Sequence, residues 1–183
     1  MAAVAILVAD GFETIECLTI LDILRRGGVR ASLVSINDTR DVISAQQVSI
    51  TCDEVFSDVD FDVYDYVVLP GGMPGTTHLR RDERVCDVVR EFAATKHVAA
   101  ICAAPTILAN LGFLDRRRAV CYPGMEELMG SAVVQKGAPV VADGHIITGE
   151  AAGSSFPFGL KLVEVLKGAE AARQVCHAVH YHG

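Results

Sequence analysis

One stretch of the chain, residues 96–112, limits the possible fold more than any other. Residues 98–101 are a short apolar run, which is typical of a strand buried on both faces of a sheet. Pro105 fits the first turn of a helix, where its missing N–H costs nothing, and Gly112 is a natural stop for that helix. Cys102 therefore falls at the sharp corner where a central strand becomes a helix.

The corner at Cys102 has a chemical consequence. Free backbone N–H groups and the positive end of a helix dipole favour an anion at such a position. We therefore expect the pKa of the Cys102 thiol to be lowered, so that the side chain is largely a thiolate near neutral pH. The alternative is a buried structural cysteine, because free cysteines are among the most buried residue types.

The composition narrows the class of protein. The 183 residues are enough for one domain, 1–183, with a sizeable core, and an apolar share of 51% argues against disorder. The net charge of −7 and the isoelectric point near 5.3 argue against a nucleic-acid surface. The chain shows neither a basic leader nor an apolar run of membrane-spanning length. These features predict a cytoplasmic protein that binds no nucleic acid and no membrane.

Six cysteines are scattered along the chain, and none forms a CxxC pair. Neither a zinc ribbon nor a thioredoxin-type site is therefore indicated, and in a reducing compartment we expect free thiols. Three histidines near the C-terminus, His177, His180 and His182, have no visible partner ligands in the sequence. No metal site is predicted.

The opening of the chain alternates strand and helix. A strand is predicted for residues 2–8, a helix for 14–26 and a second strand for 30–36. This order implies a parallel sheet with a right-handed crossover. The apolar face of the predicted helix is expected to consist mainly of Ile15, Leu18, Leu21, Ile23 and Leu24.

The middle of the chain adds a hairpin, a buried strand and a glycine-rich turn. Residues 42–51 alternate loosely, which favours a short hairpin at the sheet edge, and residues 64–69 form a strong buried strand. This strand runs into residues 70–75, where glycines let backbone amides approach a ligand closely. The carboxyl edge of a doubly wound sheet is where ligands bind. An ordinary strand-exit turn is the alternative for residues 70–75.

The remaining elements are predicted by the same patterns. Helices are expected at 79–94 and 156–166, strands at 118–122 and 145–148, and a tail of modest helical character at 169–183. No internal repeat or low-complexity linker divides the chain.

Four sequence blocks together support a family resemblance. They are Ala9-Asp10-Gly11-Phe12-Glu13-Thr14-Ile15-Glu16, Val67-Val68-Leu69-Pro70-Gly71-Gly72, Ala99-Ala100-Ile101-Cys102-Ala103-Ala104-Pro105 and Gly153-Ser154-Ser155-Phe156. Through them the chain resembles the DJ-1/ThiJ/PfpI superfamily, in its DJ-1/ThiJ-like branch, from about Ala2 to Gly168. The resemblance implies an α/β, flavodoxin-like fold: a doubly wound, mostly parallel sheet with helices on both faces and a nucleophile elbow at Cys102. It also implies a homodimer, with Asp22 and Arg26 at the dimer surface.

The resemblance assigns roles within the site. It implies that Cys102 is the reactive cysteine and Glu16 its carboxyl partner, and that Gly71, Gly72 and Ala103 supply backbone amides near the thiolate. Two anions in hydrogen-bond contact repel, so a thiolate at Cys102 requires a protonated Glu16 that donates to the sulfur. The same donor can transfer protons or hold an oxidised sulfur. Otherwise Glu16 is an ordinary solvated helix residue.

The chain departs from its relatives at several positions. Ala103 stands where PfpI-type proteases have a histidine, which argues against a Cys-His peptidase or amidase. Tyr122 stands where DJ-1-like relatives have a histidine, so an imidazole base is missing there. Gln46 and Glu150 replace family arginines, which weakens any shared anion specificity.

Cys121 is a candidate second thiol. It ends the strand predicted at 118–122, and Cys102 follows the strand at 98–101. If both strands belong to one sheet, the two thiols lie near each other and a reversible disulfide between them becomes a hypothesis.

Three functions follow from the resemblance, and none needs a cofactor. The first is a glyoxalase or deglycase activity on reactive aldehydes or glycated adducts, with a role in protection against oxidative stress. The second is a non-catalytic redox sensor or chaperone that acts through oxidation of Cys102. The third is thiamine-pathway chemistry, suggested by the ThiJ label alone; it ranks last because no P-loop or metal-carboxylate cluster supports phosphate transfer. A cysteine peptidase also ranks low, because Ala103 replaces the histidine.

Overall fold

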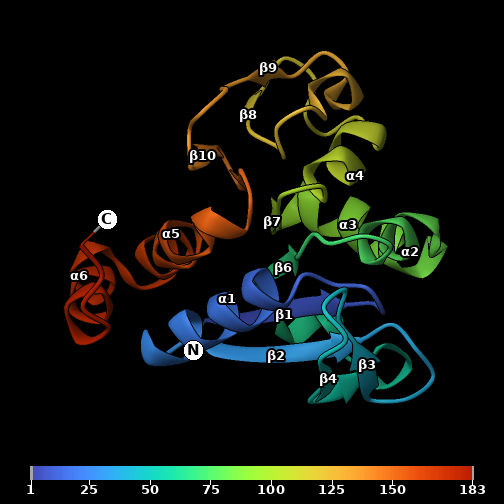
Figure 1. Cartoon of the computed structure of the whole chain (residues 1–183), viewed down its shortest axis with the longest axis horizontal. Coiled ribbons are helices and arrows are strands. Elements are labelled where there is room, and N and C mark those ends of the chain that lie inside the picture. The colour runs from blue at the N-terminus through green and yellow to red at the C-terminus, as the bar shows by residue number, and fades with distance from the viewer. Residues whose placement is uncertain (1, 183) are drawn as a thin grey trace.

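The computed structural model describes residues 2–182; Met1 and Gly183, at the two ends of the predicted domain and tail, lie outside the described residues. A seven-stranded sheet forms its centre, in the order β10-β11-β7-β6-β1-β2-β5 (Figure 1). The strands β10 and β11 are antiparallel, and every other neighbouring pair is parallel. The bounds are β1 Ala3–Val8, β2 Arg30–Ser35, β5 Glu54–Val55, β6 Tyr66–Leu69, β7 His97–Ile101, β10 Val140–Asp143 and β11 Ile146–Gly149.

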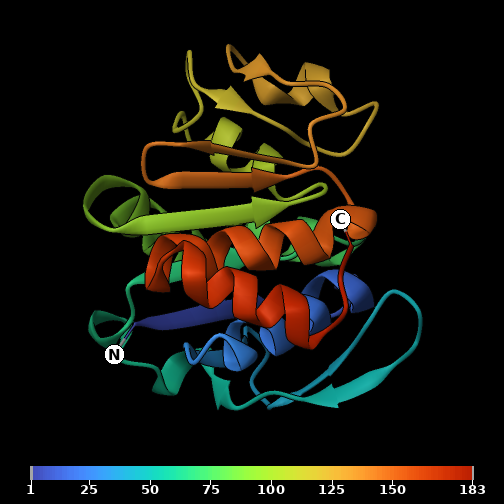
Figure 2. The same cartoon turned by 90° about the vertical axis from the view of Figure 1, so that its left-hand side faces the viewer.

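Helices cover both faces of this sheet, as the sequence predicts. The helices α1, α5 and α6 lie on one face, which turns toward the viewer in Figure 2, and α2, α3 and α4 lie on the other. Their bounds are α1 Thr14–Arg26, α2 Gly75–Arg81, α3 Glu83–Thr95, α4 Pro105–Asn110, α5 Ser155–Lys167 and α6 Ala169–Ala178. None of the helices among residues 2–182 combines the length and apolar character needed to cross a membrane.

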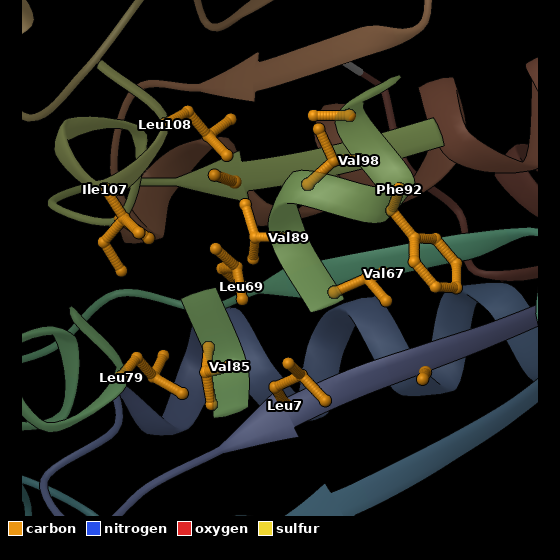
Figure 3. Close-up of a cluster of buried hydrophobic side chains, with 14 of the residues drawn as sticks. Leu7, Val67, Leu69, Leu79, Val85, Val89, Phe92, Val98, Ile107 and Leu108 are labelled. Atoms are coloured by element: carbon orange, nitrogen blue, oxygen red, sulfur yellow. The ribbon is translucent and has the colours of Figure 1, made fainter. Parts of the chain in front are cut away.

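The strands are apolar on both faces because both faces are covered. In β1, Ala5 and Leu7 point into the cluster packed against α3, whereas Ile6 and Val8 point into the cluster packed against α1. We call these the α3-face cluster and the α1-face cluster. Figure 3 shows the α3-face cluster, in which Val89 on α3 lies among the side chains of the sheet. Full burial of one such aliphatic side chain contributes about 1.5–3 kcal/mol, so two complete clusters account for a stable sheet.

The helix predicted at 79–94 is two helices in the structure. The helix α2 begins earlier than predicted, at Gly75, and the chain breaks at Asp82 before α3 starts. The Asp82 side chain accepts a hydrogen bond of 3.0 Å from the Arg84 backbone N–H, which caps α3. Asp82, a preferred N-cap residue within a run of charged residues, was the sequence signal for this break.

The predicted edge hairpin exists, but it is not part of the central sheet. Strands β3 (Asp41–Ile43) and β4 (Ser49–Thr51) pair with each other in a sheet of their own. The hairpin is attached to the loop after β1: the Gly11 N–H donates to the Ile43 carbonyl at 2.7 Å, and the Ala45 N–H donates to Phe12 at 2.8 Å. The edge strand of the main sheet is β5 instead.

The strand predicted at 118–122 is also shorter and differently placed. Only Arg118–Ala119 forms a strand, β8, and it pairs with β9 (Val133–Val134) outside the main sheet. Four short 3-10 helices complete the chain, at Phe56–Asp58, Phe61–Val63, Glu126–Met129 and Ala152–Ser154. The predicted helical tail is α6, which packs on α5 through residues of the α1-face cluster such as Val175.

Candidate active site

Cys102 lies at a tight elbow between β7 and α4. Its φ of +67° is in the left-handed region, which a non-glycine residue adopts only where the surrounding structure enforces it. Two neighbours do so: the Cys102 N–H donates to the Gly149 carbonyl at 3.0 Å, and the Tyr122 N–H donates to the Cys102 carbonyl at 2.7 Å. The residue is 9% exposed, so the sulfur lies just beneath the surface.

The glycine turn at residues 70–75 lies directly against this elbow. A Cβ on Gly71 would lie 2.7 Å from the Cys102 Cβ and 2.7 Å from the Glu16 Oε2 atom. Gly72 has a φ of +92°, and a Cβ there would lie 2.3 Å from the Glu13 backbone nitrogen. Neither position has room for a side chain, so the backbone itself lines the site. This contact favours the ligand-facing interpretation of residues 70–75 over an ordinary turn.

Three backbone amides lie at the site: two act on the Cys102 sulfur and one on the Glu16 carboxyl. The N–H groups of Gly72 and Ala103 point at the Cys102 sulfur and act to lower the pKa of that thiol. The Gly71 N–H instead donates to the Glu16 Oε2 atom at 2.7 Å. The expectation that both glycines face the sulfur therefore differs from the structure in one respect: Gly71 holds the carboxyl partner.

Glu16 is fully buried, although it sits on a helix that runs along the surface. The buried face of α1 includes Glu16, Cys17 and Ile20, whereas Ile15 is 53% exposed; the predicted apolar face was therefore wrong at Ile15. Burial raises the pKa of Glu16 from 4.5 to about 7, against smaller opposing contributions from the Cys102 thiol and the Gly71 N–H. Its second oxygen, Oε1, has no hydrogen-bond partner among residues 2–182. A carboxyl in this position titrates near neutral pH.

The Cys102 thiol shows the opposite direction to the one predicted. Burial, followed by the charge of Glu16 and the hydrogen bond to it, raises the pKa of Cys102 to about 12. Both contributions of Glu16 require its carboxyl to be ionised. When Glu16 is protonated they vanish, and burial is left as the cause that opposes the amides of Gly72 and Ala103, which favour the thiolate. Cys102 and Glu16 thus form a coupled pair, in which a proton on the carboxyl is the condition for a charge on the sulfur.

Cys121 lies close to the elbow because the next residue is hydrogen-bonded to it, and not because the two thiols follow strands of one sheet. The next residue, Tyr122, bonds to the Cys102 carbonyl, as described above. The Cys121 side chain belongs to the α3-face cluster and that of Cys102 to the α1-face cluster. Burial and the charges of Glu126 and Glu150 raise the pKa of Cys121 to about 11. All six cysteines are free thiols.

Two histidines, His97 and His145, lie at the far end of the sheet from Cys102. His97 begins β7 and His145 immediately precedes β11, so both lie at the amino edge, with ring centroids 6.4 Å apart. Cys102 lies at the other end of β7, five residues away, which corresponds to about 16 Å of extended chain. Neither imidazole can act directly at the thiol.

The positions that differ from the family have other contacts. Tyr122 is 48% exposed beside the elbow. Gln46, from the β3–β4 hairpin, reaches the start of α1, where its Oε1 atom accepts hydrogen bonds from the Thr14 N–H at 3.2 Å and the Thr14 hydroxyl at 2.7 Å. Within residues 2–182 no three histidine, cysteine or acidic side chains are grouped to hold a metal ion.

One residue of the site was not predicted from the sequence. The Glu13 side chain accepts a hydrogen bond of 2.7 Å from the Glu16 backbone N–H, at the N-cap of α1. Glutamate is not among the preferred N-cap residues, so its position gave a weak signal. A negative charge just ahead of a helix is favourable by itself, and that preference could have indicated it.

The chain is similar to known proteins over nearly its whole length. The model of the DJ-1/PfpI family matches residues 2–165. The chain is 33% identical to protein dj-1beta of Drosophila melanogaster over 172 residues, which cover 93% of this chain and 92% of the fly protein. It is 30% identical over 174 residues to glutathione-independent glyoxalase DJR-1.2 of Caenorhabditis elegans, covering 92% and 90% of the two chains.

The fold of the chain also matches a solved structure over its whole length. The crystallised Toxoplasma gondii DJ-1, in an oxidized form, superimposes with a TM-score of 0.95 at 32% identity, and the match covers 100% of both chains. This agreement confirms the flavodoxin-like α/β fold that the sequence predicts.

Proposed function

The chain belongs to the DJ-1/PfpI family, and we propose that it converts small 2-oxoaldehydes to 2-hydroxy acids at Cys102 without a cofactor. The observation that supports this most directly is the contact between a buried carboxyl that titrates near pH 7 and a thiol held among backbone amides. The relative named as a glutathione-independent glyoxalase supports the same reaction class. Glycated adducts of such aldehydes are a second substrate class for this chemistry.

The first step forms a carbon–sulfur bond. The Cys102 thiolate adds to the aldehyde carbon of the substrate, and the carbonyl π electrons move to oxygen. The resulting alkoxide takes the proton of Glu16, which gives a neutral hemithioacetal and leaves Glu16 as a carboxylate. The N–H groups of Gly72 and Ala103, which face the sulfur, stabilise negative charge during this step.

The next steps move a hydrogen between two carbons of the substrate. The Glu16 carboxylate removes the proton from the former aldehyde carbon, and the electrons delocalise onto the neighbouring ketone oxygen as an enediolate. Glu16 then gives this proton to the neighbouring carbon, and the hydroxyl proton on the first carbon moves to the neighbouring oxygen. The product is a thioester of the 2-hydroxy acid, so one carbon is oxidised and the other reduced. Water then hydrolyses the thioester, releasing the acid and the Cys102 thiol. A group with a pKa of about 7 suits both directions of proton transfer.

The experiment is an assay with methylglyoxal, followed by enantiomer-specific detection of lactate. We expect lactate to form with the intact protein and to fall to the uncatalysed level in Cys102→Ser. The matched control is Cys121→Ser, which removes a neighbouring thiol and should retain turnover within a few-fold. Equal lactate from the intact protein and Cys102→Ser would refute the proposed activity.

A second candidate function is a redox sensor or chaperone that works through oxidation of Cys102. The amides of Gly72 and Ala103 point at the sulfur and could hold sulfinate oxygens, and the Glu16 carboxyl could donate to them when protonated. The Toxoplasma gondii relative was crystallised in an oxidized form. A stoichiometric mass gain of two oxygens on Cys102 at low peroxide, without lactate formation, would favour this function. A disulfide with Cys121 instead would appear as a loss of two hydrogens.

We also propose that the protein is a cytoplasmic homodimer. Three apolar side chains are exposed: Ile15 on α1, and Ile43 and Val48 on the hairpin. The hairpin is hydrogen-bonded to the loop that precedes α1, and exposed apolar side chains of this kind suit a protein interface. Asp22 and Arg26 are exposed on α1 and pair with each other at 2.6 Å. A monomer mass in sedimentation equilibrium would refute the dimer. Thiamine-pathway chemistry and peptidase activity gain no support from the site.

A further inference from the structure

A closed ring of hydrogen bonds joins Glu13, Glu16 and Gly71. The Glu13 backbone N–H donates to the Gly71 carbonyl at 2.9 Å. The Gly71 N–H donates to the Glu16 Oε2 atom at 2.7 Å. The Glu16 backbone N–H donates to the Glu13 Oε2 atom at 2.7 Å, which completes the ring. The ring ties the start of α1 to the glycine turn and leaves the Glu16 carboxyl a single fixed orientation.

We propose that Glu13 is a positioning residue that controls the protonation of Glu16, and through it the state of Cys102. This inference rests on the proposed role of the Cys102–Glu16 pair. Glu13 has two means of action: its hydrogen bonds fix the Glu16 carboxyl beside the sulfur, and its half-buried carboxylate repels a second negative charge on Glu16. This repulsion adds to burial, the larger cause, in favouring a proton on Glu16, whereas the Gly71 N–H favours the carboxylate.

Two neutral groups oppose this repulsion: hydrogen bonds from the Cys102 thiol and from the Gly71 N–H lower the pKa of Glu16, each by more than the charge of Glu13 raises it. The groups that face Glu16 are the Cys102 thiol from the elbow, the Gly71 N–H from the glycine turn, and Cys17 from its own helix. Both thiols have raised pKa values and are neutral near pH 7 while Glu16 is charged, and no cationic side chain is among the groups that shift the pKa of Glu16 in the described part of the chain. Among the groups in residues 2–182 that shift the pKa of Glu16, Glu13 is the one charged carboxylate, and it raises that pKa.

The variant Glu13→Gln separates the charge from the geometry. The glutamine amide oxygen can still accept from the Glu16 N–H, so the ring is kept while the charge is removed. The titration of the Glu16 carboxyl is followed by carbon-13 NMR of labelled glutamate side chains, with the signal assigned by its absence in Glu16→Gln. We expect the midpoint of Glu16 to fall by about half a pH unit or more in Glu13→Gln. The control Glu170→Gln removes an exposed carboxylate on α6 and should not move it.

The variant Glu13→Ala tests the geometry. It should open the ring and increase hydrogen–deuterium exchange of the Glu16 and Gly71 amides by about tenfold or more, whereas Glu13→Gln should keep them protected. A midpoint in Glu13→Gln that moves no further than in Glu170→Gln would overturn the role of charge. Unchanged exchange in Glu13→Ala would overturn the ring. Neither readout depends on methylglyoxal turnover, so both remain informative if the proposed enzymatic activity fails.

Discussion

Cys102 and Cys17 are two buried thiols in the same α1-face cluster, and both are influenced by Glu16. Cys17 lies inside the regular turns of α1, where its own N–H is bonded to the Glu13 carbonyl at 3.1 Å. Burial raises the pKa of Cys17 well above its ordinary value, and the charges of Cys52, Glu13 and Glu16 raise it further. Cys102 is less completely buried, at 9% exposed against 0% for Cys17, and two backbone amides act to lower the pKa of its thiol.

The difference shows that backbone shape acts together with the degree of burial to distinguish the Cys102 thiol from the Cys17 thiol. In a helix interior the amides are used by the helix itself, so none is left for the Cys17 sulfur. At the elbow the left-handed conformation of Cys102 frees the next amide, and the glycine turn brings a second one. Each prediction below alters one part of this contrast, starting with the largest expected effect.

Glu16→Gln should remove the proton donor and leave the shape of the site intact. Glutamine cannot transfer a proton, so turnover of methylglyoxal should fall by about 10²- to 10⁴-fold. Alkylation of Cys102 by iodoacetamide near pH 8 should persist, because burial still raises the pKa of the thiol but the charge of Glu16 no longer adds to it. Mass spectrometry of the alkylated protein should show Cys17 unmodified. Turnover within tenfold of the unchanged protein would remove Glu16 from the mechanism.

Gly72→Ala should damage the elbow and leave the helix around Cys17 intact. The new Cβ would collide with backbone atoms of Glu13 and Phe12, at a positive φ. We expect the free energy of unfolding to fall by about 3 kcal/mol or more. Gly28→Ala is the matched control: its φ is also positive, at +68°, but no atom lies within 4 Å, so a loss of about 1 kcal/mol is expected. Urea denaturation measures the free energy of unfolding of both variants. Equal losses would show that the close contact at Gly72 does not contribute to the destabilisation.

The stability of the fold should depend on pH through Glu16. The folded state holds the Glu16 proton up to a pKa of about 7, whereas the unfolded chain releases it near 4.5. The folded state therefore binds more protons between these values, so this contribution to stability is complete below 4.5 and is lost as the pH rises through 7. The loss is at most about 3 kcal/mol. Urea midpoints at pH 5 and pH 8 should differ more in the intact protein than in Glu16→Gln; equal differences would contradict the buried carboxyl.

Cys17→Ser should have the smallest effect and complete the comparison. A hydroxyl replaces a thiol in an apolar cluster, so the free energy of unfolding should fall by about 1–2 kcal/mol. Turnover should stay within about twofold, since Cys17 contributes no group to the reaction. Thermal unfolding together with the lactate assay checks both. A loss of turnover comparable to that in Cys102→Ser would show that the two thiols act together.

Much of the site could be predicted because its parts follow local rules. The apolar run before Cys102, Pro105 after it, and the glycines after a buried strand each indicate one element, and parallel strands bring their carboxyl ends to one edge. The sequence could not predict that the Gly71 N–H bonds Glu16 while the Gly72 N–H acts on the Cys102 sulfur, because this depends on where α1 places Glu16. The exposed Ile15 was missed for a related reason: helical spacing alone does not say which face of α1 meets the sheet.

The resemblance to the family supplied the candidate partners of the Cys102 thiol. The amino-acid sequence by itself determined most of the strands and helices and the corner at Cys102. These depend on hydrophobic spacing, glycine and proline, which act over a few residues. Only the tertiary structure decided which amide faces the sulfur, that Glu13 closes a ring with Glu16 and Gly71, and that the pKa of Cys102 is raised while Glu16 is charged. Hydrogen bonds and desolvation depend on ångström-scale distances between segments far apart in the chain, and no local pattern specifies them.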